Sequence, residues 1–249
     1  MKNRLLEIKK LKKIYHNQKD EVLAIDNLDL EVYENEIVAI VGPSGCGKST
    51  LLSILANLEE KSSGEINFYE NNNIGYMLQN DSLFPWRNIL NNCLIGLELK
   101  KELINDNIDY VKKLLNKYGL KEFIDSYPSN LSGGMKQRVA LIRTLATNPS
   151  LLLLDEPYSA LDYQTRLALS NDLYNIIKQE KKTAIMITHD IAEAISLADR
   201  IIVLTKRPCQ VKTIYTIELE NKKTPIENRK DKKFNYYYDM IWRDLDVHI

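Results

Sequence analysis

Residues 37–49 read Ile-Val-Ala-Ile-Val-Gly-Pro-Ser-Gly-Cys-Gly-Lys-Ser, and this stretch decides the fold. Its apolar first part predicts a short strand buried on both faces, which is typical of a parallel sheet. Its second part, from Gly42 to Ser49, matches the phosphate-binding pattern G-x-x-x-x-G-K-[ST]. The glycines allow backbone N–H groups to curl around phosphate oxygens, and a helix expected from about Ser49 to Asn57 would point its positive dipole end at the same anion. The stretch therefore predicts a P-loop between a strand and a helix.

Two side chains of this loop have expected roles in binding a nucleotide. Lys48 would pair with the β and γ phosphates, and Ser49 would ligate Mg²⁺. The nucleotide-binding residues expected from this stretch are Gly42, Pro43, Ser44, Gly45, Cys46, Gly47, Lys48, Ser49 and Thr50.

A pair of carboxylates follows the apolar run Leu151–Leu154. Asp155 and Glu156 would both lie at the C-terminal edge of a parallel sheet, where ligands bind in open α/β folds. We expect Asp155 to hold the Mg²⁺ shell and Glu156 to take a proton from the attacking water. Apolar strands that end in acids are common, so the pair is informative only in combination with the P-loop.

Strand and helix patterns alternate along the rest of the chain. Buried strands are expected at 151–154, 183–188 and 200–204, with amphipathic helices between them. This alternation indicates an α/β fold, a P-loop NTPase core with a parallel sheet and helices on both faces. Leu5–Ile8 and Leu28–Val32 alternate in hydrophobicity like strands, and we expect a small antiparallel β lobe beside the core.

The chain divides into a large domain, residues 1–220, and a tail, residues 221–249. A helical pattern interrupts the large domain and is expected to form an inserted α-helical lobe at about 85–147. One face of this pattern carries Ile104, Ile108, Val111, Leu115 and Tyr118. The tail begins with a polar, charged linker at 221–233 and ends in an amphipathic helix. One face of that helix carries Phe234, Tyr237, Tyr238, Ile241, Trp242 and Leu245. We expect this stripe to pack on the chain's own core or across a dimer, because soluble proteins avoid exposing such a surface.

Charge and cysteine content narrow the class of protein. The 249 residues include 34 Lys and Arg and 34 Asp and Glu, so no global charge draws the chain to nucleic acid or anionic lipid. The three cysteines fit neither a metal site nor a disulfide framework, which indicates a reducing compartment. The N-terminus has no signal-peptide core, and no apolar run approaches the ~20 residues that span a bilayer. We therefore expect a soluble protein whose membrane role, if it has one, comes through a partner.

A third motif, Leu131-Ser-Gly-Gly-Met-Lys-Gln-Arg138, places Ser132, Gly133 and Gly134 at the start of a helix. A hydroxyl and N–H groups at such a position form a second potential anion cradle. One domain does not need two cradles for one nucleotide, but two copies arranged head to tail would use both on each ATP. The sequence therefore predicts a homodimer with ATP at its interface.

This third motif resembles the signature of ABC ATPases, and the resemblance covers nearly the whole chain, with the motifs in the family's order and spacing. It implies an ABC-type ATPase domain over residues 1–220, with ATP and Mg²⁺ as cofactors. By the same resemblance, Tyr15 would stack on adenine and Gln79 would sense the γ-phosphate and Mg²⁺. Asp162 would end a D-loop, Ser159-Ala-Leu-Asp162, and His189 would be the switch histidine. The catalytic residues expected are thus Lys48, Gln79, Glu156 and His189, and the metal ligands are Ser49, Gln79 and Asp155.

A narrower likeness connects Leu83-Phe-Pro-Trp-Arg87 and Glu156-Pro-Tyr-Ser-Ala-Leu-Asp162 with ATPase subunits of the nitrate/sulfonate/taurine importer group, which includes carriers of thiamine-precursor pyrimidines. It implies a peripheral subunit at the cytoplasmic face of the cell membrane. Its partners would be transmembrane permease subunits and, indirectly, an extracytoplasmic solute-binding protein, with no nucleic acid. The apolar run after Gln79 is expected to line a groove for a permease helix. One departure from the family is the short stretch Gly64–Ile74, which puts the adenine contacts in question.

Several alternatives stay open at this point. Tyr15 and Trp86 could be core aromatics, and His189 could be structural. The chain could be a soluble ABC ATPase not engaged in transport that acts on ribosomes or DNA, although those typically carry two ATPase units, a long coiled coil or zinc inserts. It could also be a regulatory module that binds nucleotide without turnover, although Glu156 and His189 are both present.

Overall fold

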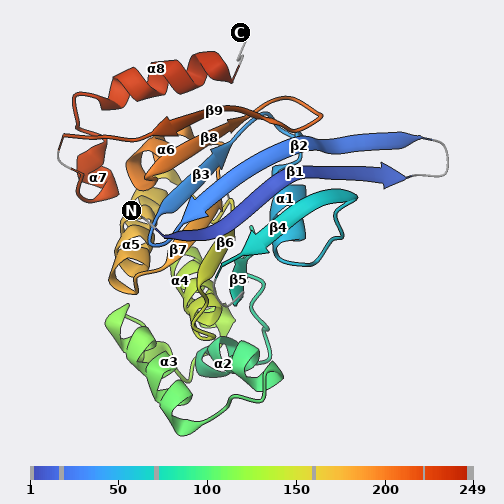
Figure 1. The fold of residues 1–249 in the computed structure, drawn as a ribbon. Coiled ribbons are helices and arrows are strands. Elements are labelled where there is room, and N and C mark those ends of the chain that lie inside the picture. Colours follow the sequence, from blue (N-terminus) through green and yellow to red (C-terminus); the bar gives the residue numbers. More distant parts are fainter. Residues whose placement is uncertain (1–2, 17–19, 70–72, 159–160, 221, 246–249) are drawn as a thin grey trace.

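The computed structural model describes residues 3–16, 20–69, 73–158, 161–220 and 222–245. A six-stranded sheet with the order β5-β6-β7-β3-β8-β9 forms the centre, and a three-stranded antiparallel sheet, β2-β1-β4, lies across one of its faces (Figure 1). The central strands are β3 (Ile37–Val41), β5 (Ile74–Met77), β6 (Leu151–Asp155), β7 (Thr183–Ile187), β8 (Arg200–Leu204) and β9 (Val211–Thr216). The antiparallel strands are β1 (Arg4–His16), β2 (Glu21–Tyr33) and β4 (Ser63–Phe68). The α/β architecture with a parallel sheet and an antiparallel lobe is confirmed.

β3 is buried on both faces because it contributes to two separate cores. Ile37, Ala39 and Val41 pack into the core on the side of the sheet that faces the longer helices. Val38 and Ile40 pack into the other core, which the antiparallel sheet covers. Since successive side chains of a strand point to opposite faces, a continuous apolar run is what this position requires.

Helices cover both faces of the central sheet. α1 (Lys48–Leu55) lies on the face that the antiparallel sheet covers, since its buried residues belong to the second core. The opposite face carries α4 (Gly133–Leu145), α5 (Tyr163–Gln179) and α6 (Ile191–Leu197). Ser132, Asp162 and Asp190 begin these three helices, because each side chain accepts a hydrogen bond from a free N–H of the first turn.

The helical lobe projects from the base of the sheet (Figure 1). It contains α2 (Ile89–Leu99) and α3 (Asn105–Lys117), followed by two short 3₁₀ turns at Lys121–Phe123 and Pro128–Asn130. Val111 and Leu115 are buried on the face of α3 that the sequence predicts. Ile104 was expected on the same face, but it is 57% exposed because it precedes the first turn as the N-cap residue.

Three strands differ from the sequence expectations. β1 and β2 extend over 13 residues each and form a long hairpin ladder, whereas the alternating pattern covers only Leu5–Ile8 and Leu28–Val32. Shifts in register between the two strands break the strict alternation of side chains, which explains why the pattern is short. β9 was not expected at all. It is an edge strand whose residues are at most partly buried, so its sequence carries no run of apolar residues.

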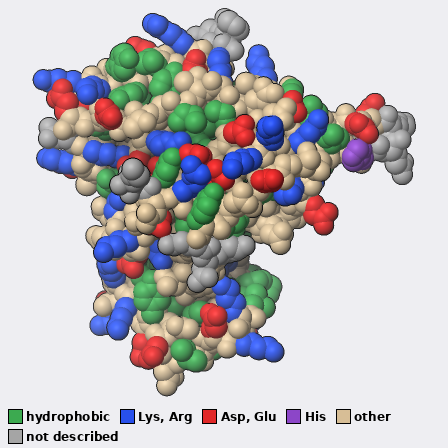
Figure 2. Space-filling model, in the orientation of Figure 1, with side chains coloured by type: hydrophobic (Ala, Val, Ile, Leu, Met, Phe, Trp, Pro, Cys, Tyr) green, Lys and Arg blue, Asp and Glu red, His purple; other side chains and the backbone are tan. Residues whose placement is uncertain are grey.

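The face seen in Figure 2 carries interspersed basic and acidic side chains over both sheets and the helical lobe. This mixture agrees with the equal numbers of basic and acidic residues in the chain. On this face no large field of one sign is present among the described residues that would attract a polyanion.

The C-terminal region is more ordered than a linker followed by a helix. Residues 221–233 were expected to be a linker, but they contain α7 (Pro225–Asn228), whose Asn228 is fully buried. α8 (Phe234–Asp244) follows and packs on α6. Phe234 and Ile241 are buried in the core, so most of the apolar stripe docks on this chain.

The side chain of Asn228 holds α7 against the core. Its Nδ2 donates to the carbonyl oxygen of Ser196 at 2.8 Å, and its Oδ1 accepts from the N–H of Lys223 at 2.7 Å. Asn228→Ala removes both hydrogen bonds and takes this donor from the carbonyl group of the buried Ser196, which costs about 1–3 kcal/mol. We expect the melting temperature to fall by roughly 2–4 °C for each kcal/mol lost. Asn235→Ala, at an exposed position of α8, is the matched control; equal melting temperatures in both variants would show that α7 is not anchored this way.

Candidate active site

The carboxyl ends of the central parallel strands meet at one edge of the sheet. Because β3 lies between β7 and β8, the loop that follows β3 is flanked by the segments that follow those two strands. A cavity of about 560 Å³ opens at this edge. It is lined by Gly42, Ser44, Gly45, Gly47, Lys48, Ser49, Thr50, Glu156, His189 and Arg207. The structure therefore brings the P-loop, the expected base and the expected switch histidine together.

Gly47 allows the loop to turn directly into α1. Its φ of 124° lies in a region that side-chain-bearing residues rarely adopt, and an added Cβ would lie 3.2 Å from the carbonyl oxygen of Ala24. Among the described residues no side chain caps α1, so the first N–H groups of the helix can bind an anion in the cavity.

Lys48 is the cation of this loop. Its Nζ donates to the carbonyl oxygens of Gly42 and Pro43, at 2.8 and 2.9 Å, and the side chain is 8% exposed. The ammonium group thus sits inside the curl of the loop, at the wall of the cavity. An anionic phosphate chain would find a fixed positive charge there.

Cys46 lies beneath the loop and is 1% exposed. The neighbouring Cys209 thiol lowers the pKa of Cys46, and the Lys48 ammonium, with Nζ 4.0 Å from Sγ, acts in the same direction. Because the side chain is buried and does not line the cavity, it packs beneath the loop against Gly42. Of the P-loop residues expected to bind nucleotide, Cys46 could act only through its backbone.

Asp155 ends β6 beside the helix that follows the P-loop. Its Oδ1 accepts from the hydroxyl of Ser49 at 3.4 Å, and its Oδ2 accepts from the hydroxyl of Tyr76 at 3.4 Å. Burial raises the pKa of Asp155, the nearby Glu156 charge adds to that effect, and the two hydroxyls oppose it. Tyr76 was not singled out in the sequence, where it is one aromatic residue within a strand pattern.

Glu156 lines the cavity and contacts two other expected site residues. Its Oε2 lies 3.2 Å from Nε2 of Gln79, which donates to it, and 3.4 Å from Nδ1 of His189. The backbone of Glu156 has φ of 45°, in the left-handed region, and its N–H donates to the carbonyl oxygen of Ile187 at 3.0 Å. A non-glycine residue held in this conformation is strained, and such strain is typical of functional sites.

A buried carboxyl group supports the segment that carries His189. The hydroxyl of Thr188 forms a short hydrogen bond with Glu193, which is 4% exposed. The N–H of Asp190 donates to the same hydroxyl at 3.1 Å. Burial raises the pKa of Glu193. Glu193 was missed in the sequence, where its place on the polar side of a helix pattern gives no signal.

Ser132 and Asp162 lie together, but apart from the P-loop cavity. Each hydroxyl or carboxylate caps its own helix, since Ser132 Oγ accepts from Met135 N at 3.3 Å and Asp162 Oδ1 accepts from Thr165 N at 3.0 Å. An added Cβ on Gly133 would lie 3.2 Å from Leu161, next to Asp162, and Gly134 likewise approaches α5. Ser159 and Ala160 of the expected D-loop lie outside the described residues.

Tyr15 is half-buried at the end of β1 and does not line the cavity. Its hydroxyl donates to Oε2 of Glu59 at 2.9 Å and lies 3.3 Å from Oγ1 of Thr50 in the first turn of α1. The ammonium group of Lys13 lies 4.7 Å from the ring centroid. Tyr15 therefore borders the helix that receives the phosphates, and its contact with adenine stays a prediction.

The chemistry of the expected metal ligands suits a hard cation. Ser49 and Asp155 bring two oxygens within 3.4 Å of each other, whereas Gln79, the third expected ligand, donates to Glu156. In the described part of the chain, no group of three or more His, Cys, Asp or Glu side chains could hold a metal ion. The two oxygens of Ser49 and Asp155 fit Mg²⁺, which keeps few protein ligands and completes its shell with phosphate oxygens and water.

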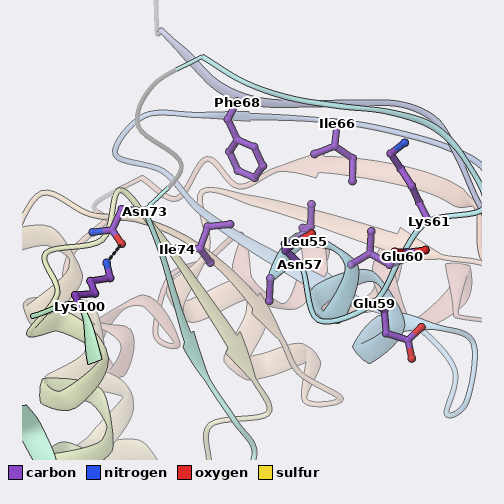
Figure 3. A pocket seen from close by; sticks show the side chains of 12 residues that line it. Leu55, Asn57, Glu59, Glu60, Lys61, Ile66, Phe68, Asn73, Ile74 and Lys100 are labelled. Atoms are coloured by element: carbon purple, nitrogen blue, oxygen red, sulfur yellow. Dashed lines mark hydrogen bonds between the residues drawn. The ribbon is translucent and has the colours of Figure 1, made fainter. Parts of the chain in front are cut away.

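A second, larger cavity of about 790 Å³ lies beneath the antiparallel sheet (Figure 3). Ile66 and Phe68 point into it from β4 toward Leu55 and Ile74, and Lys100 closes one side through a 2.7 Å hydrogen bond to Asn73. None of the P-loop residues lines it. It lies where β4 leads to β5, the connection that is short in this sequence.

Membrane-crossing helices are not found among the described residues, since none is both long and apolar enough. The chain matches the family model for ABC transporter proteins over residues 25–159. The fold also resembles the ATP-binding cassette MJ0796, solved as a dimer in a post-hydrolysis state with ADP and Pi. The TM-score is 0.73, with 31% identity over 86% of this chain and 99% of that one.

Relatives along the full length give a consistent picture. The chain is 43% identical to an uncharacterized ABC transporter ATP-binding protein of Methanocaldococcus jannaschii, covering 96% of this chain and 94% of the relative. It is 37% identical to the nitrate import ATP-binding protein NrtD of Synechocystis sp., with coverages of 95% and 93%. An aliphatic sulfonates import ATP-binding protein, SsuB of Bacillus thuringiensis, is also 37% identical, with coverages of 92% and 91%. The resemblance stated from the sequence is thus confirmed, and the chain belongs to the ABC transporter family as a subunit that binds and hydrolyses ATP.

Proposed function

We propose that this chain energises the import of a small solute, with two copies arranged head to tail on separate permease subunits. The observation that carries the proposal is the separation of two anion cradles. The P-loop shares a cavity with Glu156 and His189, whereas Ser132 lies outside that cavity. One chain therefore supplies two half-sites that do not meet. The relative MJ0796 is a dimer with ADP and Pi, which supports the same use of two copies here.

In such a composite site Glu156 would act as the general base. We expect its carboxylate to take a proton from a water whose oxygen attacks the γ-phosphorus. The bond between that phosphorus and the bridging oxygen breaks, and ADP leaves with the electron pair. Lys48 and His189 would stabilise the charge that develops on the γ-phosphoryl oxygens, together with Ser132 of the opposite copy.

Ser49 and Asp155 would hold Mg²⁺ through their oxygens, with Gln79 beside them. When bound, Mg²⁺ would neutralise charge on the β and γ phosphates. The partial burial of Asp155 fits this role, because a carboxylate shielded from water gains more from a nearby cation than an exposed one. Tyr76, which donates to the same carboxylate, would orient Asp155 toward Ser49.

The proposed permease contact is the aromatic pair Phe84 and Trp86, in the segment that leads into α2; Phe84 is half-buried and Trp86 is exposed. Trp86 is 70% exposed, so it is not a core residue, and its ring centroid lies 5.2 Å from that of Phe84. The fully buried Asn92 fixes this loop, since its Oδ1 accepts from the N–H of Phe84 at 2.7 Å and its Nδ2 donates to three carbonyl oxygens of residues 84–88. A rigid aromatic anchor suits a stable protein interface.

The solute class comes from the relatives. Two of them carry the names of nitrate and aliphatic sulfonate importers. We propose a small anion such as nitrate, a sulfonate or taurine, or a thiamine-precursor pyrimidine, delivered by an extracytoplasmic solute-binding protein. The subunit would then lie at the cytoplasmic face of the membrane.

Replacing the proposed base tests the chemistry. Glu156→Gln keeps the size of the side chain and removes its ability to accept a proton. We expect ATP turnover to fall by ~10²-fold or more while ATP still binds. Glu65→Gln, at an exposed position of β4, is the matched control and should turn over like the wild type. Near-normal turnover in Glu156→Gln would remove Glu156 from the mechanism.

Replacing the aromatic pair tests the coupling to transport. Trp86→Ala and Phe84→Ala should keep ATP turnover in the isolated chain but weaken binding to the co-encoded permease by about thirtyfold or more, as the loss of a hot spot does. Tyr127→Ala removes another exposed aromatic residue from the same lobe, 49% exposed, and should bind normally. Unchanged assembly and transport in both aromatic variants would rule out this surface.

A further inference from the structure

The turn between β8 and β9 carries a cation to the rim of the P-loop. Nη2 of Arg207 donates to the carbonyl oxygen of Gly45 at 2.8 Å, and Nε donates to the same oxygen at 3.3 Å. Arg207 also lines the cavity that contains Lys48, Glu156 and His189. None of the P-loop, acid-pair or signature motifs includes it.

The backbone of the turn fixes the place of this arginine. The N–H of Thr205 donates to the carbonyl oxygen of Gln210 at 3.0 Å. The hydroxyl of Thr205 donates to the carbonyl oxygen of Pro208 at 2.9 Å. The N–H of Cys209 donates to the carbonyl oxygen of Ala24 at 2.9 Å, which ties the turn to β2. Arg207 is thus presented from a closed, anchored turn rather than from a long loop.

The guanidinium group of Arg207 has N–H donors left to bind a ligand in the cavity. A guanidinium has five N–H donors, and the Gly45 carbonyl oxygen accepts from only two of its nitrogens. No carboxylate of the described ranges forms an ion pair with Arg207, although Glu156 lines the same cavity. A planar cation with unused donors beside an anion-binding loop is suited to phosphate oxygens.

We propose that Arg207 is a nucleotide-binding residue that donates to the phosphate chain of ATP and ADP. β3 lies between β7 and β8, so Arg207 approaches the P-loop from the side opposite His189. Arg207 therefore contacts the phosphate chain of the bound nucleotide and not the attacking water. Interactions of this kind strengthen substrate binding and leave the chemical step nearly unchanged. The proposal rests on nucleotide binding at the P-loop and not on the transport role.

The test compares two neutralised positions of the same turn. Arg207→Gln should raise the KM for ATP, and the Kd for ATP and ADP, by roughly three- to tenfold, the range of an exposed charge-assisted hydrogen bond. Its kcat should stay within about twofold of the wild type. R207K should recover part of the affinity, since it restores the charge without the fork. Lys206→Gln removes the same charge from the exposed neighbour and should behave as the wild type.

Calorimetry with inorganic tripolyphosphate separates a phosphate contact from one to ribose or base. We expect R207Q to lose affinity for tripolyphosphate by the same factor as for ATP. Unchanged tripolyphosphate affinity, an equal loss in K206Q, or a fall of kcat at constant KM would each overturn the proposal. Lys48→Ala provides the reference for the site itself. If K48A and R207Q both bind tripolyphosphate normally, the P-loop assignment fails as well, whereas a loss in K48A alone overturns only the role of Arg207.

Discussion

Hydrogen bonding of β3 to β7 on one side and β8 on the other is the constraint on which the rest of the structure depends. This pairing places the P-loop, His189 and Arg207 side by side at one edge of the sheet. β6 joins on the far side of β7 and adds Asp155 and Glu156 to the same edge. The alternating burial of β3 in two cores makes the register costly to shift, because a slip of one residue would exchange both sets of apolar side chains. The chemistry of the site thus follows from the packing of five apolar residues.

The site is built from residues that backbone and side-chain hydrogen bonds hold in place, and in the proposed function a second copy completes it. Glu156 is held in a left-handed backbone conformation by its bond to the strand next to it, and His189 follows a threonine that a buried glutamate fixes. Ser132 and Asp162 cap α4 and α5, whose N-termini lie near each other but outside the P-loop cavity. In the proposed dimer, a second copy brings its own Ser132, at the start of α4, to the nucleotide. Opening and closing that contact would then transmit the state of the nucleotide to a permease.

The sequence is most informative where a short motif and a buried strand coincide. The P-loop, the acid pair and the signature serine all have local patterns, and the structure places each at the end of the expected strand or the start of the expected helix. Arg207, Tyr76 and Glu193 could not be found this way, since each acts through a tertiary neighbour and has no motif of its own. β9 and α7 were missed for a related reason: an edge strand and a four-residue helix carry too few apolar residues to show a period. Tyr15 shows the converse, because its expected role came from family resemblance and its contacts here are with Glu59 and Thr50.

If each ATP is shared between two chains, as we propose, then mixing two defective chains tests this sharing most directly. One chain carries Lys48→Ala and the other Ser132→Arg, so each homodimer has a defect in both of its sites. A mixed dimer gathers both defects into one site and leaves the other intact. Random pairing makes about half of the dimers mixed, so ATPase activity should recover to roughly a quarter of the wild-type level if one site can turn over alone. No gain over either mutant at equal protein concentration, with subunit exchange confirmed independently, would contradict composite sites that work on their own.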